Sequence, residues 1–514
     1  MSDQRLDPVT LSVLTSALAG IAEEMGAVLI RGSYSSNIKE RRDCSTALFD
    51  ARGNMVAQAE HMPVHLGAMP EAVAAIMTRD PEPGDVFAIN DPYSGGTHLP
   101  DITLVSPVSA GDEVLGYAVT RAHHSDVGGM RPGSMPSDSR EIYQEGIVIP
   151  PIRLVRGGEY VRDVLDLLLA NVRTPNIRRG DLRAQIAANN IAEERIRELM
   201  DRRGRDTVLT AFEEVVSYAE KRTREAIREL PDGEHSAEDF MEGDGVTDED
   251  IPIRATVRVE DDTMTMDLTE TAGSVAGNIN CPLPVTRSAC YFALRVMLPK
   301  DIPANAGTYV PLEIETREGS LVNATYPSAV VAGNVETSNR IADTVLTALS
   351  GFAPEKVPSQ GQGTMNNVII GNPGWTYYET IGGGQGAGAD SPGPSGVHIG
   401  MSNTLNTPIE ALELEYPMRI ERYELRYGSG GDGENQGGDG IVRSVRVLEP
   451  ASLSLLTDRR RHRPKGSEGG EPGEIGRNLI NDEELPPKTS RELEAGDVVT
   501  IQSPGGGGYG KVRT

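Results

Sequence analysis

Apolar residues at helical spacing open the chain. After Pro8 they recur every three or four positions, at Leu11, Leu14, Leu18, Ile21, Met25 and Leu29. Proline is well tolerated in the first turn of a helix, and this spacing places the six side chains on one face. The pattern predicts a long amphipathic helix over residues 9–30.

Short apolar runs, typical of strands, come next. They cover residues 46–50, 55–58, 85–90, 102–106 and 115–120. Gly53 lies in the turn between the first two runs, which therefore predict a β-hairpin. The segment 69–79 between hairpin and later strands has helical spacing. The region up to about residue 160 is thus predicted to be an α/β unit with buried strands.

Two long polar segments, 181–203 and 207–230, are rich in Glu and Arg around a narrower apolar stripe. They predict an antiparallel helical hairpin whose simplest role is structural. Later segments predict paired strands over 251–268 and helices over 285–298 and 337–349. Short strands alternate with turns from about residue 420, at 423–427, 440–447 and 498–501.

These elements predict an α+β protein of several domains, with mixed sheets, a helical hairpin insert and a β-rich C-terminal portion. A length of 514 residues agrees with more than one domain. The expected divisions are an N-terminal metal-binding α/β region over 1–160, the helical hairpin over 161–235, a central α/β region with Gly-rich loops over 236–420, and the β-rich region over 421–514.

Composition narrows the class of partner. A net charge of −27 and an aromatic content of 4% argue against nucleic-acid binding, which needs a basic face or base-stacking rings. Only seven of the 49 basic residues are Lys, as expected for either a salt-adapted cytosol or a genome that encodes Arg over Lys. The N-terminus does not look like a signal peptide, and no apolar run reaches the ~18 residues of a membrane span. Three cysteines without CxxC spacing fit a reducing cytoplasm.

The chemistry concentrates in two loops. Residues 90–101 read NDPYSGGTHLPD and end on His98 and Asp101, and residues 123–126 read HHSD. Five of the eight histidines lie between positions 61 and 124, where Asp and Gly flank them. Imidazole nitrogen and carboxylate oxygen suit zinc, manganese or iron, and a set of this kind with an open position activates water. Pro100 prevents a continuous helix, so His98 and Asp101 must converge from an extended turn.

Asp43 stands directly before a predicted strand and offers a further carboxylate, although it could simply pair with Arg41 and Arg42. Cys44 beside it is better interpreted as a buried structural thiol than as a nucleophile. The Gly-rich stretches 382–390 and 505–508 are not GxxxxGK[ST] loops and do not connect a clear strand to a helix. We expect them to serve close backbone packing or turns with positive φ rather than to bind ATP.

Many long motifs together resemble those of the hydantoinase B / 5-oxoprolinase C-terminal family. This family includes the β subunits of ATP-dependent hydantoinases and caprolactamase, and it is related to the α subunit of acetone carboxylase. The resemblance spans nearly the whole chain. Its motifs are Arg42–Ser45, His61–Gly67, Asn90–Asp101, Ala122–Gly129, Ala332–Arg340, Asn403–Glu410, Gly430–Gly433 and Gly505–Gly510.

The resemblance implies a division of labour. A partner of the hydantoinase A type, with an actin-like ATPase fold, binds ATP and phosphorylates a carbonyl or enol oxygen of the substrate. The B-type chain then hydrolyses the activated cyclic amide, such as hydantoin, 5-oxoproline or a lactam, or else carboxylates a ketone of the acetone or acetophenone type. The motifs do not separate the two reactions. An (αβ)2 assembly is implied as well, and a chain that only scaffolds the ATPase is the contrasting hypothesis.

The resemblance also assigns residues. It places a divalent metal, zinc or manganese or else iron, on Asp43, His98, Asp101 and His123. His123 is preferred over His124 because the first His of the pair matches the family's position. Near the metal, His124 is a candidate to face the substrate or support a ligand, and His65 or Asp126 could act as general base or orient the ligands.

Overall fold

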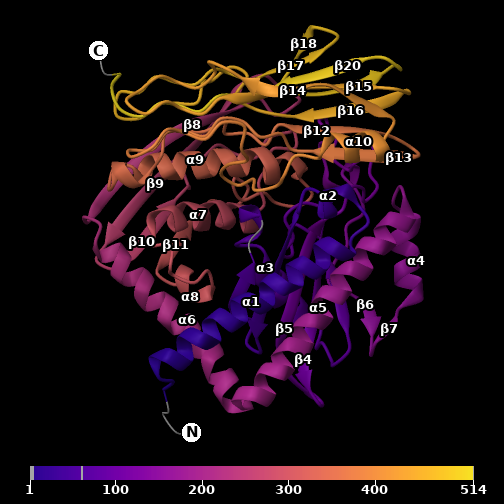
Figure 1. The fold of residues 1–514 in the computed structure, drawn as a ribbon, viewed down its shortest axis with the longest axis vertical. Helices are drawn as coiled ribbons and strands as arrows, with labels where there is room; N and C mark the ends of the chain where they lie inside the picture. Colours follow the sequence, from indigo (N-terminus) through magenta and orange to yellow (C-terminus); the bar gives the residue numbers. More distant parts are fainter. Residues whose placement is uncertain (1–4, 60–61, 513–514) are drawn as a thin grey trace.

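The N-terminal part of the chain forms a sheet of seven strands (Figure 1). The computed structural model describes residues 5–59 and 62–512. In the order β2-β1-β5-β4-β3-β6-β7, the strands are Met55–Ala59, Cys44–Asp50, Glu113–His123, Asp101–Ala110, Val86–Ile89, Ile152–Arg156 and Glu159–Tyr160. All neighbours are antiparallel, and the hairpin of β1 and β2 and the three buried strands β3, β4 and β5 confirm the predictions.

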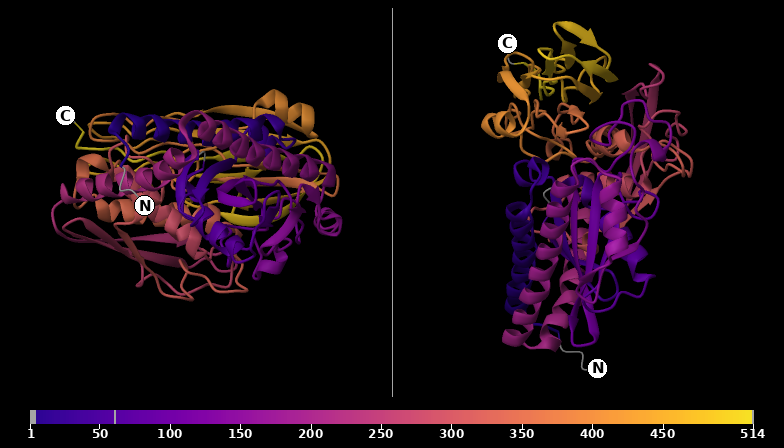
Figure 2. Two further views of the ribbon diagram at one scale, coloured as in Figure 1. Left: turned by 90° about the horizontal axis from the view of Figure 1, so that it is seen from below. Right: turned by 90° about the vertical axis from the view of Figure 1, so that its right-hand side faces the viewer.

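Helices cover both faces of this sheet. Leu48 packs in the cluster formed with α1 (Pro8–Gly32) and α5 (Pro175–Arg203), and these two helices lie side by side on that face (Figure 2). Phe49 points the other way, toward α3 (Met69–Met77) and the centre of the molecule. Alternate strand residues point to opposite faces, so coverage of both faces explains why every residue of β1 is buried.

Helix α1 corrects one expectation from the sequence. By length and composition it is apolar enough to cross a membrane, with a mean hydropathy of 1.6 over its best window. Its apolar stripe is instead buried within the protein, where Leu18, Met25 and Leu29 pack in the same cluster as Ala188 of α5. The core helix of a folded protein passes the same compositional test, because both burial and membrane insertion select apolar residues.

The two long polar helices are present as predicted. Helix α5 ends at Gly204, whose φ of 88° breaks the helix, and α6 (Arg205–Arg228) begins directly after it. From that point the helices spread apart (Figure 1), because α5 packs along α1 whereas α6 reaches α8 (Ala306–Tyr309). The two helices are therefore present, but they do not lie along each other as the predicted antiparallel hairpin would, and they link the N-terminal sheet to the central region.

The central sheet has the order β11-β10-β9-β8. Its strands are Leu312–Glu315, Thr263–Asp267, Asp250–Glu260 and Gly233–Glu242. The predicted pairing over 251–268 is confirmed by β9 and β10. The helices α7 (Leu283–Met297) and α9 (Ser338–Leu349) pack together, and α9 lies on β8 and β9. One π-helical turn, Gly333–Thr337, leads directly into α9.

Two further sheets form the strand-rich C-terminal part at the top of Figure 1. One has the order β13-β12-β16-β19, with strands Trp375–Glu379, Asn367–Asn372, Ala451–Leu456 and Lys488–Leu493. The other has the order β14-β15-β20-β17-β18, with strands Met418–Arg426, Gly440–Val447, Val498–Gln502, Arg477–Ile480 and Glu483–Leu485. Because β12 pairs with β16, the boundary expected at 421 passes between strands of one sheet. The shorter helices α2, α4 and α10 cover Ser36–Lys39, Arg162–Ala170 and Ile409–Glu415.

The Gly-rich stretches pack backbone against backbone. The amide of Gly384 donates to Pro504 and that of Gly506 to Gly438. A Cβ on Gly384 would lie 1.9 Å from the carbonyl oxygen of Gly438, a distance that no side chain tolerates. Close packing, expected from the sequence, is therefore the structural reason for these glycines.

Candidate metal centre

The candidate ligands lie where the ends of β1, β4 and β5 meet, on one side of the N-terminal sheet along the strand direction. Asp101 is the first residue of β4 and His123 the last of β5, and the register pairs them directly. Asp43 immediately precedes β1, and its carbonyl accepts a hydrogen bond from the amide of His123. His98 comes from the turn before β4, where its carbonyl accepts from the amide of Asp101. The convergence from an extended turn agrees with the sequence-based expectation.

The side chains of His98, Asp101 and His123 form a buried set, which we call the His-Asp-His cluster. Nε2 of His98 lies 3.2 Å from Oδ1 of Asp101, and Nδ1 of His123 lies 3.2 Å from the same oxygen. The two imidazole nitrogens are also 3.2 Å apart. Bonds of about 2.0–2.1 Å around a tetrahedral ion separate its ligand atoms by about 3.3 Å. The triangle therefore has the dimensions that a bound divalent ion requires.

Electrostatics favour a cation at this point. Burial lowers the pKa of His123, so its imidazole is neutral and free to act as a ligand near pH 7. Burial alone would raise the pKa of Asp101, but the charge of His98 and hydrogen bonds from the surrounding imidazoles hold it well below its usual value. Among the described residues, the polar atoms nearest to Oδ1 of Asp101 are the imidazole nitrogens of His98 and His123, and neither forms a well-aligned hydrogen bond with it. A buried carboxylate oxygen of this kind is costly without a cation.

Two neighbours hold the Asp101 carboxylate in place. The hydroxyl of Thr97 donates to Oδ2 over 2.5 Å, and Nε2 of His65 lies 3.4 Å from the same oxygen. His65 is fixed in turn by a 2.9 Å contact between its Nδ1 and the hydroxyl of Ser45. His65 thus contacts the Asp101 carboxylate, and its two predicted roles, as general base or as a residue that orients the ligands, stay predictions. Asp43 lies at the margin, with Oδ2 4.0 Å from Nδ1 of His123, and its place among the ligands stays a prediction.

His124 and Asp126 point away from the cluster. Nε2 of His124 contacts the amide oxygen of Gln185 on α5 at 2.9 Å, because successive residues at the end of β5 face opposite sides. Burial lowers the pKa of His124 to about 4. Asp126 accepts hydrogen bonds from the backbone of Gly128 and Gly133 and from Arg173. These contacts organise its loop, and a catalytic role for either residue remains a prediction with no contact to the cluster.

Two other sequence-based interpretations can be compared with the structure. Cys44 is buried, and burial raises the pKa of its thiol far above neutrality, which agrees with a structural thiol rather than a nucleophile. Arg41 does not pair with Asp43: its guanidinium bonds to Asn37, Thr380 and the carbonyl of Tyr378. His61 lies outside the described residues.

Sequence reasoning missed the residues that the C-terminal part contributes. The ring of Tyr378, on β13, stacks on the His123 imidazole with centroids 4.5 Å apart and an interplanar angle of 20°. The Arg41 guanidinium lies over the same tyrosine ring at 4.8 Å. The Tyr378 hydroxyl donates to Asn367, whose amide donates to Oε1 of Glu336. Glu336 belongs to the π-helical turn, and burial with the nearby charge of Asp458 raises its pKa to about 8.

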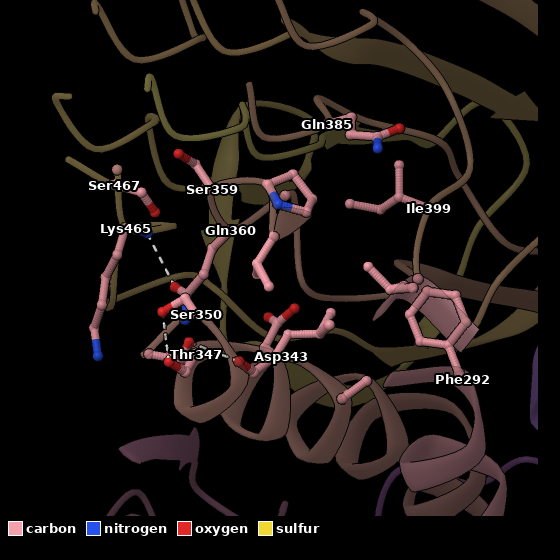
Figure 3. A pocket seen from close by; sticks show the side chains of 18 residues that line it. Phe292, Asp343, Thr347, Ser350, Ser359, Gln360, Gln385, Ile399, Lys465 and Ser467 are labelled. Atoms are coloured by element: carbon pink, nitrogen blue, oxygen red, sulfur yellow. Dashed lines mark hydrogen bonds between the residues drawn. The ribbon is translucent and has the colours of Figure 1, made fainter. Parts of the chain in front are cut away.

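A separate cavity of about 280 Å³ lies between α7, α9 and the Gly-rich loops (Figure 3). Asp343 and Gln360 point into it, with Phe292 and Ile399 on the side and Lys465 at the rim. The Asp343 carboxylate is already paired with Arg340 and Arg459. None of the three residues of the His-Asp-His cluster lines this cavity.

Fold and site together define a mixed α+β protein with a buried imidazole–carboxylate site of metal-binding type. The family model for hydantoinase B/oxoprolinase matches residues 7–512, and the chain belongs to this family. It is 36% identical over 537 residues to the B-type subunit of a putative D-/L-hydantoinase of Pseudomonas sp. (strain NS671), covering 99% of this chain and 90% of that protein. It is also 38% identical over 544 residues to 5-oxoprolinase 1 of Arabidopsis thaliana, of which it spans 42% and which covers 99% of this chain.

Solved structures show the same fold. An ATP-dependent caprolactamase from Pseudomonas jessenii superposes with a TM-score of 0.92 at 31% identity, over 99% of this chain and 92% of that one. A nucleotide-free acetone carboxylase superposes with a TM-score of 0.89 at 17% identity, over 98% and 76% of the two chains. The second likeness concerns the fold alone. The family assignment makes the chain an enzyme of the oxoprolinase and hydantoinase type, a group that hydrolyses cyclic amides.

Proposed function

We propose that this chain is the metal-dependent subunit of an ATP-dependent cyclic amidohydrolase. It acts on hydantoin, 5-oxoproline or another lactam after a hydantoinase A-type partner has phosphorylated the ring carbonyl oxygen. The observation that carries the proposal is the triangle of ligand atoms with 3.2 Å edges, buried in a chain whose relatives include an oxoprolinase and one subunit of a putative hydantoinase.

The chain's residues divide the work. His98, Asp101 and His123 would hold a zinc or manganese ion, or else iron, with Asp43 as the fourth ligand. When bound, such an ion lowers the pKa of a water molecule and stabilises negative charge that develops on oxygen. Thr97 and His65 orient the Asp101 carboxylate, and Tyr378 fixes the ring plane of His123. The burial of the cluster excludes bulk water and strengthens each of these interactions.

Phosphorylation makes the amide carbon electrophilic. One water adds to this carbon, the ring C–N bond breaks, and the nitrogen takes a proton. A second water then releases phosphate from the resulting acyl phosphate and leaves a carboxylate. The two predicted candidates for general base are His65 and Asp126. His65 contacts the cluster through Asp101, whereas Asp126 points away from it.

A partner subunit is part of the proposal. The name of the Pseudomonas relative describes it as one subunit of a hydantoinase. In the two 5-oxoprolinase relatives, the part that this chain matches is only 42% and 40% of the full length. Their additional length leaves room for an ATPase unit that this chain would meet as a separate subunit. We propose an (αβ)2 assembly in the cytoplasm, with ATP bound by the partner, and size-exclusion of the co-expressed pair tests its stoichiometry.

The decisive experiment reconstitutes the pair and measures ATP turnover with hydantoin, 5-oxoproline and caprolactam, and separately with acetone plus bicarbonate. The proposal predicts stimulation by at least one cyclic amide together with ring opening. Stimulation by ketone plus bicarbonate alone would establish the carboxylase instead. Full activity of a His98→Ala variant would show that the chain acts only as a scaffold.

A further inference from the structure

A recess of about 470 Å³ lies at the surface between β7, α4 and the start of α5. Helix α4 lies beside the first turns of α5, at the right of Figure 1. We call it the arginine recess, and it is lined by Tyr160, Arg162, Leu165, Asp166, Arg179 and Arg183. Three arginines against one aspartate leave a formal charge of +2, in a chain whose net charge is −27.

Helical periodicity brings the three arginines together. Arg162 and Asp166 are four residues apart on α4, and Arg179 and Arg183 are four residues apart on α5. Residues at this spacing share one face of a helix, so each helix presents a single face to the recess. The two arginines on α5 are like charges on neighbouring turns, and a pair of this kind destabilises the helix that carries it. An anion bound between the helices would remove this repulsion.

The three guanidinium groups are exposed and have no protein partner. Those of Arg162, Arg179 and Arg183 make no hydrogen bond and no ion pair to any residue that the structure describes. Elsewhere on the same helix α5, arginines do pair with carboxylates: Arg178 with Asp181, Arg195 with Glu24, Arg197 with Glu193 and Arg202 with Glu198. The recess therefore differs from the rest of α5, because its cations face open space instead of a carboxylate.

The donors in the recess suit a small anion with several oxygens. A guanidinium is a planar fork of N–H groups that matches phosphate oxygens two at a time. The hydroxyl of Tyr160 makes no hydrogen bond to the described residues and adds a further donor. Asp166 is the opposing charge in the lining, and it forms no ion pair with the arginines. A protein partner would cover about 20–30 residues, far more than the six that form this compact recess.

We propose that the arginine recess binds a phosphate-type dianion, supplied as inorganic phosphate or as the phosphate group of a nucleotide. Two negative charges balance the +2 of the lining residues, and the ligand bridges α4 and α5 through guanidinium groups from both helices. The site is separate from the His-Asp-His cluster, because no residue of the cluster lines the recess. The assignment does not depend on the proposed function, since binding is measured without turnover.

The test is equilibrium dialysis of the full chain against radiolabelled inorganic phosphate and, separately, ADP, at one fixed ionic strength. Arg179→Gln and Arg183→Gln are each expected to weaken binding about 10-fold, because each removes a charge-assisted hydrogen-bond donor. Asp166→Asn is expected to strengthen binding about threefold, because it removes the opposing charge. The matched control is Arg203→Gln, on the same helix but outside the recess, where the arginine is also exposed and unpaired among the described residues. It should bind like the wild type.

Competition and folding controls complete the test. Sulfate should displace the bound probe, whereas acetate at the same ionic strength should not. The exchanged side chains are exposed and make no bonds, so the melting temperatures of the variants in phosphate-free buffer should not fall. Arginine-dependent binding of inorganic phosphate identifies free phosphate as the ligand, and arginine-dependent binding of ADP alone identifies the nucleotide.

Three results would overturn the assignment. The first is binding of neither probe, and the second is equal binding by the wild type, Arg179→Gln and Arg183→Gln. The third is phosphate binding that His98→Ala abolishes and the arginine variants retain, because the phosphate would then lie at the cluster.

Discussion

Thr97 offers a sharp test of the cluster because it contacts the Asp101 carboxylate through the oxygen that does not face His98 and His123. Its hydroxyl donates to Oδ2 of Asp101 over 2.5 Å, and both side chains are buried. Thr97→Val keeps the shape of the side chain and removes the donor. A hydrogen bond to a charged group contributes about 1.5–3 kcal/mol, which corresponds to about a 10- to 150-fold loss of metal affinity. Losses of roughly 10- to 100-fold are usual when a group that orients a metal ligand is removed.

The assay is competition with a chelator on the purified full chain, performed with zinc and with manganese. Thr97→Ser restores the hydroxyl and is expected to bind metal within about threefold of the wild type. The matched control is Thr46→Val, because the Thr46 hydroxyl is equally buried but donates to the carbonyl of Ala22, away from the cluster. Wild-type affinity in Thr97→Val, or an equal loss in Thr46→Val, would refute the role given to Thr97.

Three further predictions follow from particular contacts. Tyr378→Phe keeps the ring on His123 and loses the hydrogen bond to Asn367, so metal affinity should change little in the same chelator assay. Tyr378→Leu removes the ring and should weaken metal affinity roughly 10-fold. Equal affinities of the two variants would refute the stacking role. The pKa of Glu336 is raised to about 8, above that of an unfolded glutamate, so its protonated form is the stable one in the fold. Stability should therefore fall as pH rises from about 4.5 to 8, at up to about 1.4 kcal/mol per unit, and Glu336→Gln should flatten this slope in denaturant titrations; an unchanged slope would contradict the assignment. Gly384→Ala should lower the melting temperature severely, because its Cβ would lie 1.9 Å from a carbonyl oxygen. Gly20→Ala on α1, where a Cβ would have nothing within 4 Å, should raise stability by about 1 kcal/mol. Similar melting temperatures for the two variants would refute the packing argument.

Local sequence patterns were sufficient to predict that His98, Asp101 and His123 come together. The strand ends at Asp101 and His123 follow from apolar runs that stop at polar residues, and Pro100 forces the turn that joins His98 to Asp101. The antiparallel register then aligns Asp101 with His123. Each of these features lies within a few residues of the ligand it positions, which is why periodicity and turn chemistry could anticipate it.

The residues that contact these histidines from distant parts of the chain could not be predicted in this way. Tyr378 is separated from His123 by 255 residues along the chain and reaches it only because the C-terminal sheet packs over the end of the N-terminal one. Gln185, on a helix whose simplest expected role was structural, contacts His124 for a similar reason. Such contacts depend on how whole layers pack, and a single sequence carries little information about that packing. The apolar helix α1 shows the same limit, because composition does not reveal what covers it.

The central claim is that ring opening depends on an ion held by His98, Asp101 and His123. The most direct measurement removes metal from the purified chain, adds it back in steps, and records ATP-dependent ring opening by the reconstituted pair at each step. The account predicts that activity is lost on removal and returns in proportion to added metal up to one ion per chain, with no recovery in His98→Ala. Full ring-opening activity in the metal-free chain would contradict it.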